Sequence, residues 1–124
     1  ADLDAGFELW ERMPEVGGCV SVCQSMESPW HMYRLGNSNS LTPMIPTSDI
    51  GQRRQDLPKA FLLNGAFYFI KVNRFLTERR LIFADSLGFE MPMARSIDID
   101  TLEDLTVARQ QLTNWNGIIP NINN

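Results

Sequence analysis

Apolar residues recur along the chain with two periods, one typical of helices and one typical of strands. Residues 2–13 and about 102–112 carry apolar side chains three and four positions apart, which predicts an amphipathic helix near each end. Residues 19–23 alternate in character and residues 60–72 form the strongest apolar segment, so both are predicted as strands. Helices and strands mixed in this way indicate an α/β fold.

Shorter elements are predicted between these four. Residues 30–34 and 41–45 are predicted as two short strands around a polar loop at 36–39, which tolerates the left-handed backbone of a hairpin turn. Asn73 can cap a short helix over 74–80. Further extended pieces are expected at 81–83, 88–91 and 96–100, a polar loop at 46–58, and a frayed tail at 115–124.

Composition indicates one small globular domain that spans all 124 residues, with 44% hydrophobic and 21% charged residues. No apolar stretch approaches the roughly 20 residues of a membrane-spanning helix. The first residues are acidic rather than basic and apolar, so we expect no export signal and a cytoplasmic protein. Cys19 and Cys23 lie too far apart on one predicted strand for a disulfide, and free thiols fit that compartment.

Charge is distributed unevenly along the sequence. The net charge of −4 argues against a nucleic-acid partner. Residues 50–80 nevertheless carry seven basic and two acidic side chains, a local net charge of +5. A basic middle in an acidic chain suits a small anionic ligand. A solvated basic surface that pairs with the acidic remainder explains the same pattern equally well.

Asp98 and Asp100 are the first candidates for chemistry. On an extended segment, residues two positions apart point to the same side, so two carboxylates can converge on one hard cation. Mg²⁺ suits such a pair because it prefers oxygen ligands and keeps several waters. The alternative is that both aspartates simply cap the helix that follows them.

Polar residues on the basic loop and in the apolar strand are the next candidates. Arg53 and Arg54 can bind a carboxylate or phosphate, and Gln55 can add amide hydrogen bonds, although a solvated loop is as compatible with the pattern. Asn64 must be hydrogen-bonded if it is buried, either by the backbone or by a ligand. Tyr68 lies on the same predicted strand face as Asn64. A purely structural role in the core explains both residues as well. Gly65 between them predicts a bulge or a close backbone approach.

Other reaction types find little support in the sequence. His31 is the only histidine, so neither a histidine metal site nor a catalytic triad can be proposed from spacing. No glycine-rich phosphate-binding motif occurs. Residues 98–102 partly match the aspartate nucleophile motif of haloacid-dehalogenase-type phosphatases, but the glycine before Thr101 is missing and too little sequence follows for the remaining machinery.

Three motifs in order resemble the CMP-sialic acid synthetases, or acylneuraminate cytidylyltransferases. They are RRQDLP at 53–58, NGAFY at 64–68, and SIDID at 96–100 leading into TLEDL. The resemblance is to the second half of the family. It implies a partial nucleotidyltransferase-type, Rossmann-like three-layer α/β fold that lacks the N-terminal nucleotide-binding half. It also implies a dimerisation arm over about residues 71–92.

The resemblance further implies a reaction and a set of site residues. Family members join a nine-carbon sugar acid to CMP, using CTP and Mg²⁺ and releasing pyrophosphate. Asp98 and Asp100 match the metal-binding aspartates, and Arg54 matches the arginine on the sugar-acid side. The residues implied to contact the sugar acid or border its pocket are Arg53, Arg54, Gln55, Asn64, Tyr68 and His31.

Two functions therefore remain open at this point. The chain is either the sugar-acid-binding and dimerising half of a cytidylyltransferase, as part of a longer chain or beside a separate N-terminal half, or a stand-alone module of that origin without turnover. We expect the isolated chain to be inactive and to form a homodimer. The apolar residues expected to need cover in that dimer are Phe69, Phe75, Leu81, Ile82 and Phe83.

Overall fold

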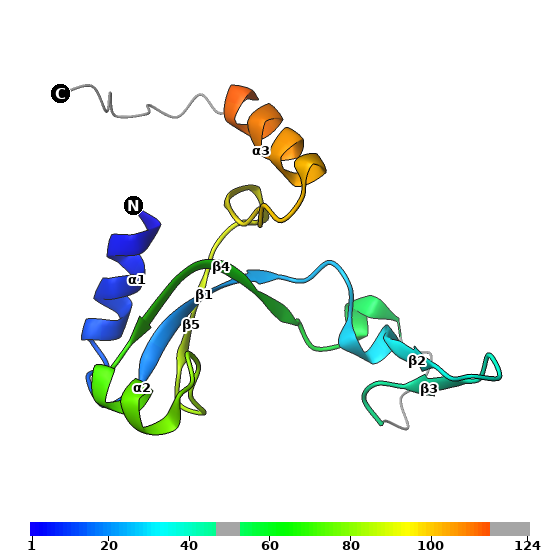
Figure 1. Cartoon of the computed structure of the whole chain (residues 1–124), viewed down its shortest axis with the longest axis horizontal. Coiled ribbons are helices and arrows are strands. Elements are labelled where there is room, and N and C mark those ends of the chain that lie inside the picture. The colour runs from blue at the N-terminus through cyan, green and yellow to red at the C-terminus, as the bar shows by residue number, and fades with distance from the viewer. Residues whose placement is uncertain (47–52, 115–124) are drawn as a thin grey trace.

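Three strands form the central sheet of the protein. The computed structural model describes residues 1–46 and 53–114, so the predicted tail at 115–124 and part of the loop at 46–58 lie outside the described residues. Strands β1 (Gly18–Gln24), β4 (Phe61–Ile70) and β5 (Leu87–Glu90) are arranged in the order β4-β1-β5 (Figure 1). β1 is antiparallel to β4 and parallel to β5. This mixed sheet confirms the α/β class.

Three α-helices accompany the sheet. Helix α1 (Asp2–Glu11) packs on β1 and β5, and Gly6 lets it approach closely, since a Cβ there would overlap the ring of Phe67. Helix α2 (Val72–Glu78) follows β4 directly. Helix α3 (Leu102–Asn114) stands away from the sheet (Figure 1), and Leu102 on its predicted apolar stripe is 80% exposed. None of the helices in the described part of the chain has the length and apolar character of a transmembrane span.

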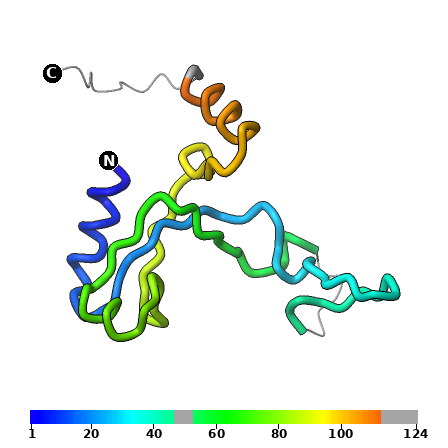
Figure 2. Tube along the Cα trace, viewed as in Figure 1, coloured from blue at the N-terminus to red at the C-terminus, as the bar shows by residue number. Residues whose placement is uncertain are grey.

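A two-stranded hairpin extends from the end of the sheet opposite α1. Strands β2 (Tyr33–Leu35) and β3 (Leu41–Pro43) pair in antiparallel fashion around the predicted polar loop. The chain trace in Figure 2 shows this hairpin projecting from the sheet. Single 3-10 turns η1 (Pro29–His31), η2 (Arg54–Asp56) and η3 (Met93–Arg95) connect the elements.

The core is small and centred on β1. Cys19 is fully buried and packs with Phe67 and Met91, and the rings of Phe67 and Phe69 stack with centroids 4.7 Å apart. Burial raises the pKa of the Cys19 thiol, because the apolar surroundings disfavour the thiolate. Cys19 and Cys23 are both free, as predicted.

The predicted irregularity at Gly65 is confirmed. Gly65 has a φ of +70°, and the register jumps there, since Val20 pairs with Tyr68 whereas Val22 pairs with Leu63. The Ser21 hydroxyl spans the gap by accepting a hydrogen bond from the Phe67 N–H (2.9 Å) and donating one to the Phe67 carbonyl oxygen (3.2 Å). The bulge is therefore fixed to β1 by a buried side chain.

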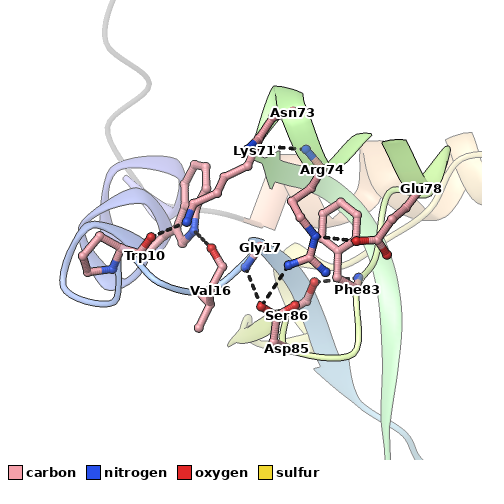
Figure 3. A network of polar contacts seen from close by, with 11 residues as sticks. Trp10, Val16, Gly17, Lys71, Asn73, Arg74, Glu78, Phe83, Asp85 and Ser86 are labelled. Carbon is pink, nitrogen blue, oxygen red and sulfur yellow. Dashed lines mark hydrogen bonds and ion pairs between the residues drawn. The ribbon is translucent and has the colours of Figure 1, made fainter. Parts of the chain in front are cut away.

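A polar network fixes the start of β1 to the segment that follows α2 (Figure 3). Asp85 Oδ2 accepts hydrogen bonds from the Gly17 N–H (3.0 Å) and from Arg74 Nη1 (3.3 Å). The Arg74 guanidinium also pairs with Glu78 and lies 4.5 Å from the centre of the Phe83 ring. Partial desolvation would raise the pKa of Asp85, but hydrogen bonds from the local backbone and from Arg74 outweigh it and lower the pKa.

Phe83 corrects two predictions. Residues 81–83 are not a strand, because Phe83 N–H donates to Ser86 Oγ (2.9 Å) and Ser86 N–H donates back to the Phe83 carbonyl oxygen (3.1 Å), which closes a turn. Phe83 is also buried in its own chain and so does not need a dimer partner to cover it. Leu81 and Ile82 remain exposed, as expected.

Smaller corrections concern where elements begin. α2 starts at Val72 with Lys71 as its N-cap residue, whereas the Asn73 side chain accepts a hydrogen bond from the next backbone N–H, so Asn73 is not the cap. The predicted strand at 30–34 begins only at Tyr33, because Pro29 starts the turn η1. The segment 96–100 is irregular rather than extended as a strand.

Candidate functional site

A pocket of about 470 Å³ lies beyond the end of β1. Two stretches far apart in sequence form it: residues 24–28, which begin with the last residue of β1, and residues 53–60, which contain η2 and lead into β4. The antiparallel register pairs Gln24 with Phe61, and the Ser25 N–H donates to the Ala60 carbonyl oxygen (2.8 Å). Arg53, Arg54 and Gln55, the predicted ligand-binding loop, all line this pocket.

The pocket is basic, and its charged side chains are unpaired within the described chain. Arg53, Arg54 and Lys59 contribute three positive charges and Glu27 one negative charge. None of the four forms an ion pair or a side-chain hydrogen bond with another described residue. Within residues 1–46 and 53–114 the loop does not pair with acidic side chains, and its exposed arginines also match the alternative of a solvated basic loop. A cluster of unpaired cations in a pocket can bind a carboxylate or a phosphate.

The sequence pattern did not indicate that residues 24–28 form one wall of the pocket. Ser28 is only 7% exposed, and its hydroxyl has no hydrogen-bond partner in the described structure, although it lines the pocket. Buried polar atoms of this kind are rare and call for an explanation such as a ligand or a water. The signal that could have found this wall is the antiparallel pairing of β1 with β4, which the local sequence pattern does not reveal.

Asp98 and Asp100 lie just before α3 and do not cap it. The helix is capped reciprocally by Thr101 and Asp104: the Asp104 N–H donates to Thr101 Oγ1 (3.2 Å) and the Thr101 N–H donates to Asp104 Oδ2 (2.9 Å). Hydrogen bonds from the Thr101 side chain and backbone lower the pKa of Asp104. The carboxylates of Asp98 and Asp100 bond to no described residue, which removes the capping explanation for both.

Asn64 connects the bulge in β4 to the segment that carries these aspartates. Its side-chain amide donates to Ser96 Oγ (2.8 Å) and to Met91 Sδ (3.4 Å), and its oxygen accepts from the Ala66 N–H (3.3 Å). Asn64 is 6% exposed, so its amide is buried and hydrogen-bonded by the protein itself. The sequence left open whether Asn64 is hydrogen-bonded by the protein or by a ligand, and in the described structure its partners belong to the protein.

Asp98 and Asp100 supply the oxygen donors that Mg²⁺ prefers. A Cβ built on Gly65 would lie 3.9 Å from Asp98 Oδ2, so that carboxylate faces the bulge. No set of three or more His, Cys, Asp or Glu side chains that could hold a metal occurs within residues 1–46 and 53–114. Mg²⁺ is commonly held by only one or two carboxylates together with water and substrate phosphates, so a pair is sufficient.

The structure does not bring all the predicted site residues together in the pocket. The pocket is lined by Arg53, Arg54 and Gln55, and by none of the other predicted residues. His31 is exposed at the end of η1, three positions after the pocket residue Ser28. The remaining predicted residues, Asn64, Tyr68, Asp98 and Asp100, lie on or after the bulge of β4 or in the segment before α3.

Comparison with known proteins gives partial matches to cytidylyltransferases. The chain is 36% identical over 73 residues to a pseudaminic acid cytidylyltransferase of Campylobacter jejuni, a match that covers 59% of this chain and 32% of the relative. It is 27% identical over 90 residues to an N-acylneuraminate cytidylyltransferase of Streptococcus agalactiae, covering 73% of this chain and 22% of that protein. No family model matches the chain. The chain is thus similar to cytidylyltransferases over about a third or less of their length.

Proposed function

We propose that this chain is the sugar-acid-binding part of a cytidylyltransferase that activates sialic acid or pseudaminic acid. In that reaction a hydroxyl of the sugar acid attacks the α-phosphate of CTP and pyrophosphate leaves. Two partial relatives named for pseudaminic acid and N-acylneuraminate support the substrate class. Their small coverage leaves the nucleotide site to the rest of the protein, in the same chain or in a separate N-terminal half.

The observation that carries the proposal is the pocket at the end of β1. Arg53, Arg54 and Lys59 bring three unpaired cations to one cavity, and Gln55 adds an amide. A guanidinium can bind a carboxylate through two parallel hydrogen bonds, which fixes orientation as well as charge. We assign the carboxylate of the sugar acid to Arg54. The neighbouring cations Arg53 and Lys59 and the amide of Gln55 assist in binding the same ligand.

Asp98 and Asp100 would hold Mg²⁺ in the complete enzyme. The bound ion would neutralise negative charge on the nucleotide phosphates, which is the main requirement of phosphoryl-type transfer. Asn64 acts in this proposal as a positioning residue, because its amide joins the bulge of β4 to Ser96, two residues before Asp98. In this view the three-stranded sheet is one part of a larger Rossmann-like, three-layer fold.

Binding of N-acetylneuraminate to the purified chain, followed by calorimetry, tests the proposal. We expect Arg54→Ala to weaken binding at least tenfold, since a hydrogen-bonded ion pair to the ligand is lost. Arg12→Ala is the matched control, because Arg12 is exposed at the end of α1 and pairs with no described residue. Equal affinities for the two variants would remove the assignment of Arg54.

We also propose that the chain forms a homodimer through the segment at about 71–92, with Tyr68 near the subunit boundary. Leu76, Leu81 and Ile82 expose 56%, 49% and 38% of their surfaces in the single chain, which supports a covering partner. Light scattering at micromolar concentration should give twice the chain mass of 14.1 kDa. A monomer under those conditions would reject this arrangement.

The 124 residues alone should release no pyrophosphate from CTP and N-acetylneuraminate, even with Mg²⁺. The pocket and the aspartate pair account for the sugar acid and the metal, whereas cytosine and ribose need further contacts. A coupled pyrophosphate assay measures this directly. Turnover by the isolated chain would mean that the nucleotide site lies within these residues.

A further inference from the structure

One acidic side chain lies among the basic residues of the pocket. Glu27 lines the cavity together with Arg53, Arg54 and Lys59, yet its carboxylate pairs with none of them. The backbone of Glu27 is held in place on both sides, because its N–H donates to Ser25 Oγ (3.2 Å) and its carbonyl oxygen accepts from the same hydroxyl (2.6 Å). The residue is thus fixed in position while its carboxylate remains available.

The adjacent residue supports a ligand at this wall. Ser28 is more than nine-tenths buried and also lines the pocket, and its hydroxyl finds no partner among the described residues. An unsatisfied buried hydroxyl costs free energy unless a bound group or water completes it. Glu27 and Ser28 are thus consecutive lining residues, one with an unpaired carboxylate and the other with a buried hydroxyl that lacks a partner among the described residues.

A carboxylate in a basic pocket changes which anions the pocket favours. It accepts hydrogen bonds and cannot donate them when ionised, so it attracts hydroxyl and amide N–H groups. It also repels additional negative charge and reduces the charge of the pocket from three to two. Specificity of this kind arises from a repulsive element as much as from an attractive one.

We propose that Glu27 is a specificity residue that makes the pocket select a monocarboxylate bearing hydroxyl or amide donors and reject polyphosphates. This inference rests on the proposed function, which assigns the ligand carboxylate to Arg54. Glu27 then accepts hydrogen bonds from donors on the remainder of the same ligand. In the complete enzyme this preference keeps the nucleotide triphosphate out of the sugar-acid pocket.

The test compares two ligands with two charge-neutralising variants of the full chain. N-acetylneuraminate represents a monoanion with several hydroxyl and amide donors, and inorganic pyrophosphate represents a polyanion that lacks sugar hydroxyl and amide groups. Both are titrated by calorimetry in metal-free buffer. Glu27→Gln should weaken the binding of N-acetylneuraminate by roughly three- to tenfold, as expected for the loss of one hydrogen bond. It should strengthen the binding of pyrophosphate by a similar factor, because one exposed repulsive charge is removed. Glu15→Gln removes the same charge from an exposed position before β1, at the opposite end of that strand.

The outcomes separate this inference from the proposed function. A shift in the ratio of the two affinities in Glu27→Gln, without one in Glu15→Gln, supports the inference. An unchanged ratio in Glu27→Gln overturns it, while loss of N-acetylneuraminate binding in Arg54→Ala still supports the proposed function. If the unaltered chain binds pyrophosphate more tightly than N-acetylneuraminate, both are wrong.

Discussion

At the start of β1 the polar side chains have partners, whereas just beyond its end the charged side chains have none within the described chain. At the start, Asp85 accepts hydrogen bonds from both Arg74 and the backbone N–H of Gly17. Glu27 and Arg54 line a pocket at the other end without an ion pair between them. The first arrangement is what a fold needs to hold a connection in place. The second leaves charged groups without partners among the described residues, at little cost because water solvates them.

The largest expected effect of a substitution lies at the packed start of the strand. A Cβ on Gly18 would overlap the carbonyl oxygen of Phe69, which belongs to the paired backbone of β4 and cannot move freely. Gly18→Ala should therefore lower the free energy of unfolding by about 2–4 kcal/mol. Urea unfolding followed by tryptophan fluorescence measures this loss.

Gly88→Ala is the control for that substitution. Gly88 pairs with β1 from the other side, and a Cβ there would meet Val22 Cγ2 at 3.5 Å, an ordinary contact. Its effect should stay below about 1 kcal/mol. Similar losses for both glycines would mean that the close approach at Gly18 is relieved by a shift of the strands.

The next effect concerns two serines, Ser21 in the middle of β1 and Ser25 just after its end. Ser21 is 1% exposed, and replacing it with alanine leaves the Phe67 N–H without its hydrogen-bond acceptor. We expect Ser21→Ala to cost about 1–3 kcal/mol of unfolding free energy. Ser25→Ala, beside the pocket, removes hydrogen bonds that are exposed and should cost less. The reverse order in urea unfolding would show that the bulge does not depend on Ser21.

Acidification should lower the free energy of unfolding through protonation of Asp85 at the start of β1. Its pKa is lowered in the folded protein relative to the ordinary value of 3.8, so the ionised form favours folding. This contribution is complete above the unfolded pKa and disappears as the pH falls through the lower folded pKa. Asp85→Asn should reduce stability at neutral pH and flatten the decline of stability on acidification.

Asp56→Asn is the matched change beside the pocket, where the side chain of Asp56 bonds to no described residue. It should change the free energy of unfolding at neutral pH by no more than about 0.5 kcal/mol, whereas Asp85→Asn should lower it. If Asp85→Asn preserves the full acid-dependent decline, the network around Arg74 contributes nothing to this titration.

The smallest expected effect is on stability at the pocket. Arg54→Ala should change the free energy of unfolding by no more than about 0.5 kcal/mol, because its side chain is exposed and unpaired among the described residues. Arg74→Ala should lower the urea midpoint clearly, since its contacts with Asp85, Glu78 and Phe83 are lost. An equal loss for the two arginines would make Arg54 a structural residue and remove the contrast between the ends of β1.

Elements with a strong local pattern were predicted correctly. The helices near both ends, the strands around Cys19 and Phe67, and the irregularity at Gly65 follow from apolar spacing and from the backbone freedom of glycine. The segment at 81–83 was predicted wrongly, because a short apolar run is also compatible with a turn that buries one aromatic side chain. Tertiary burial of Phe83 decided between the two.

The candidate site was predicted in part. Arg53, Arg54 and Gln55 could be selected because paired arginines and an amide on a polar loop are chemically distinctive, and all three line the pocket. Glu27 and Ser28 could not be selected, since nothing in their immediate sequence distinguishes them from an ordinary connection. They become part of the pocket only through the pairing of β1 with β4.

By itself, the sequence determined the class of fold, the positions of the main helices and strands, the free cysteines and the basic loop. Each of these depends on the periodicity, spacing or charge of residues close together along the chain. The tertiary structure alone decided that residues 24–28 meet residues 53–60, that Asn64 bonds internally, and that Asp98 faces the bulge. These outcomes depend on strand register, which is fixed by the combined packing of segments far apart in sequence and leaves no local signal.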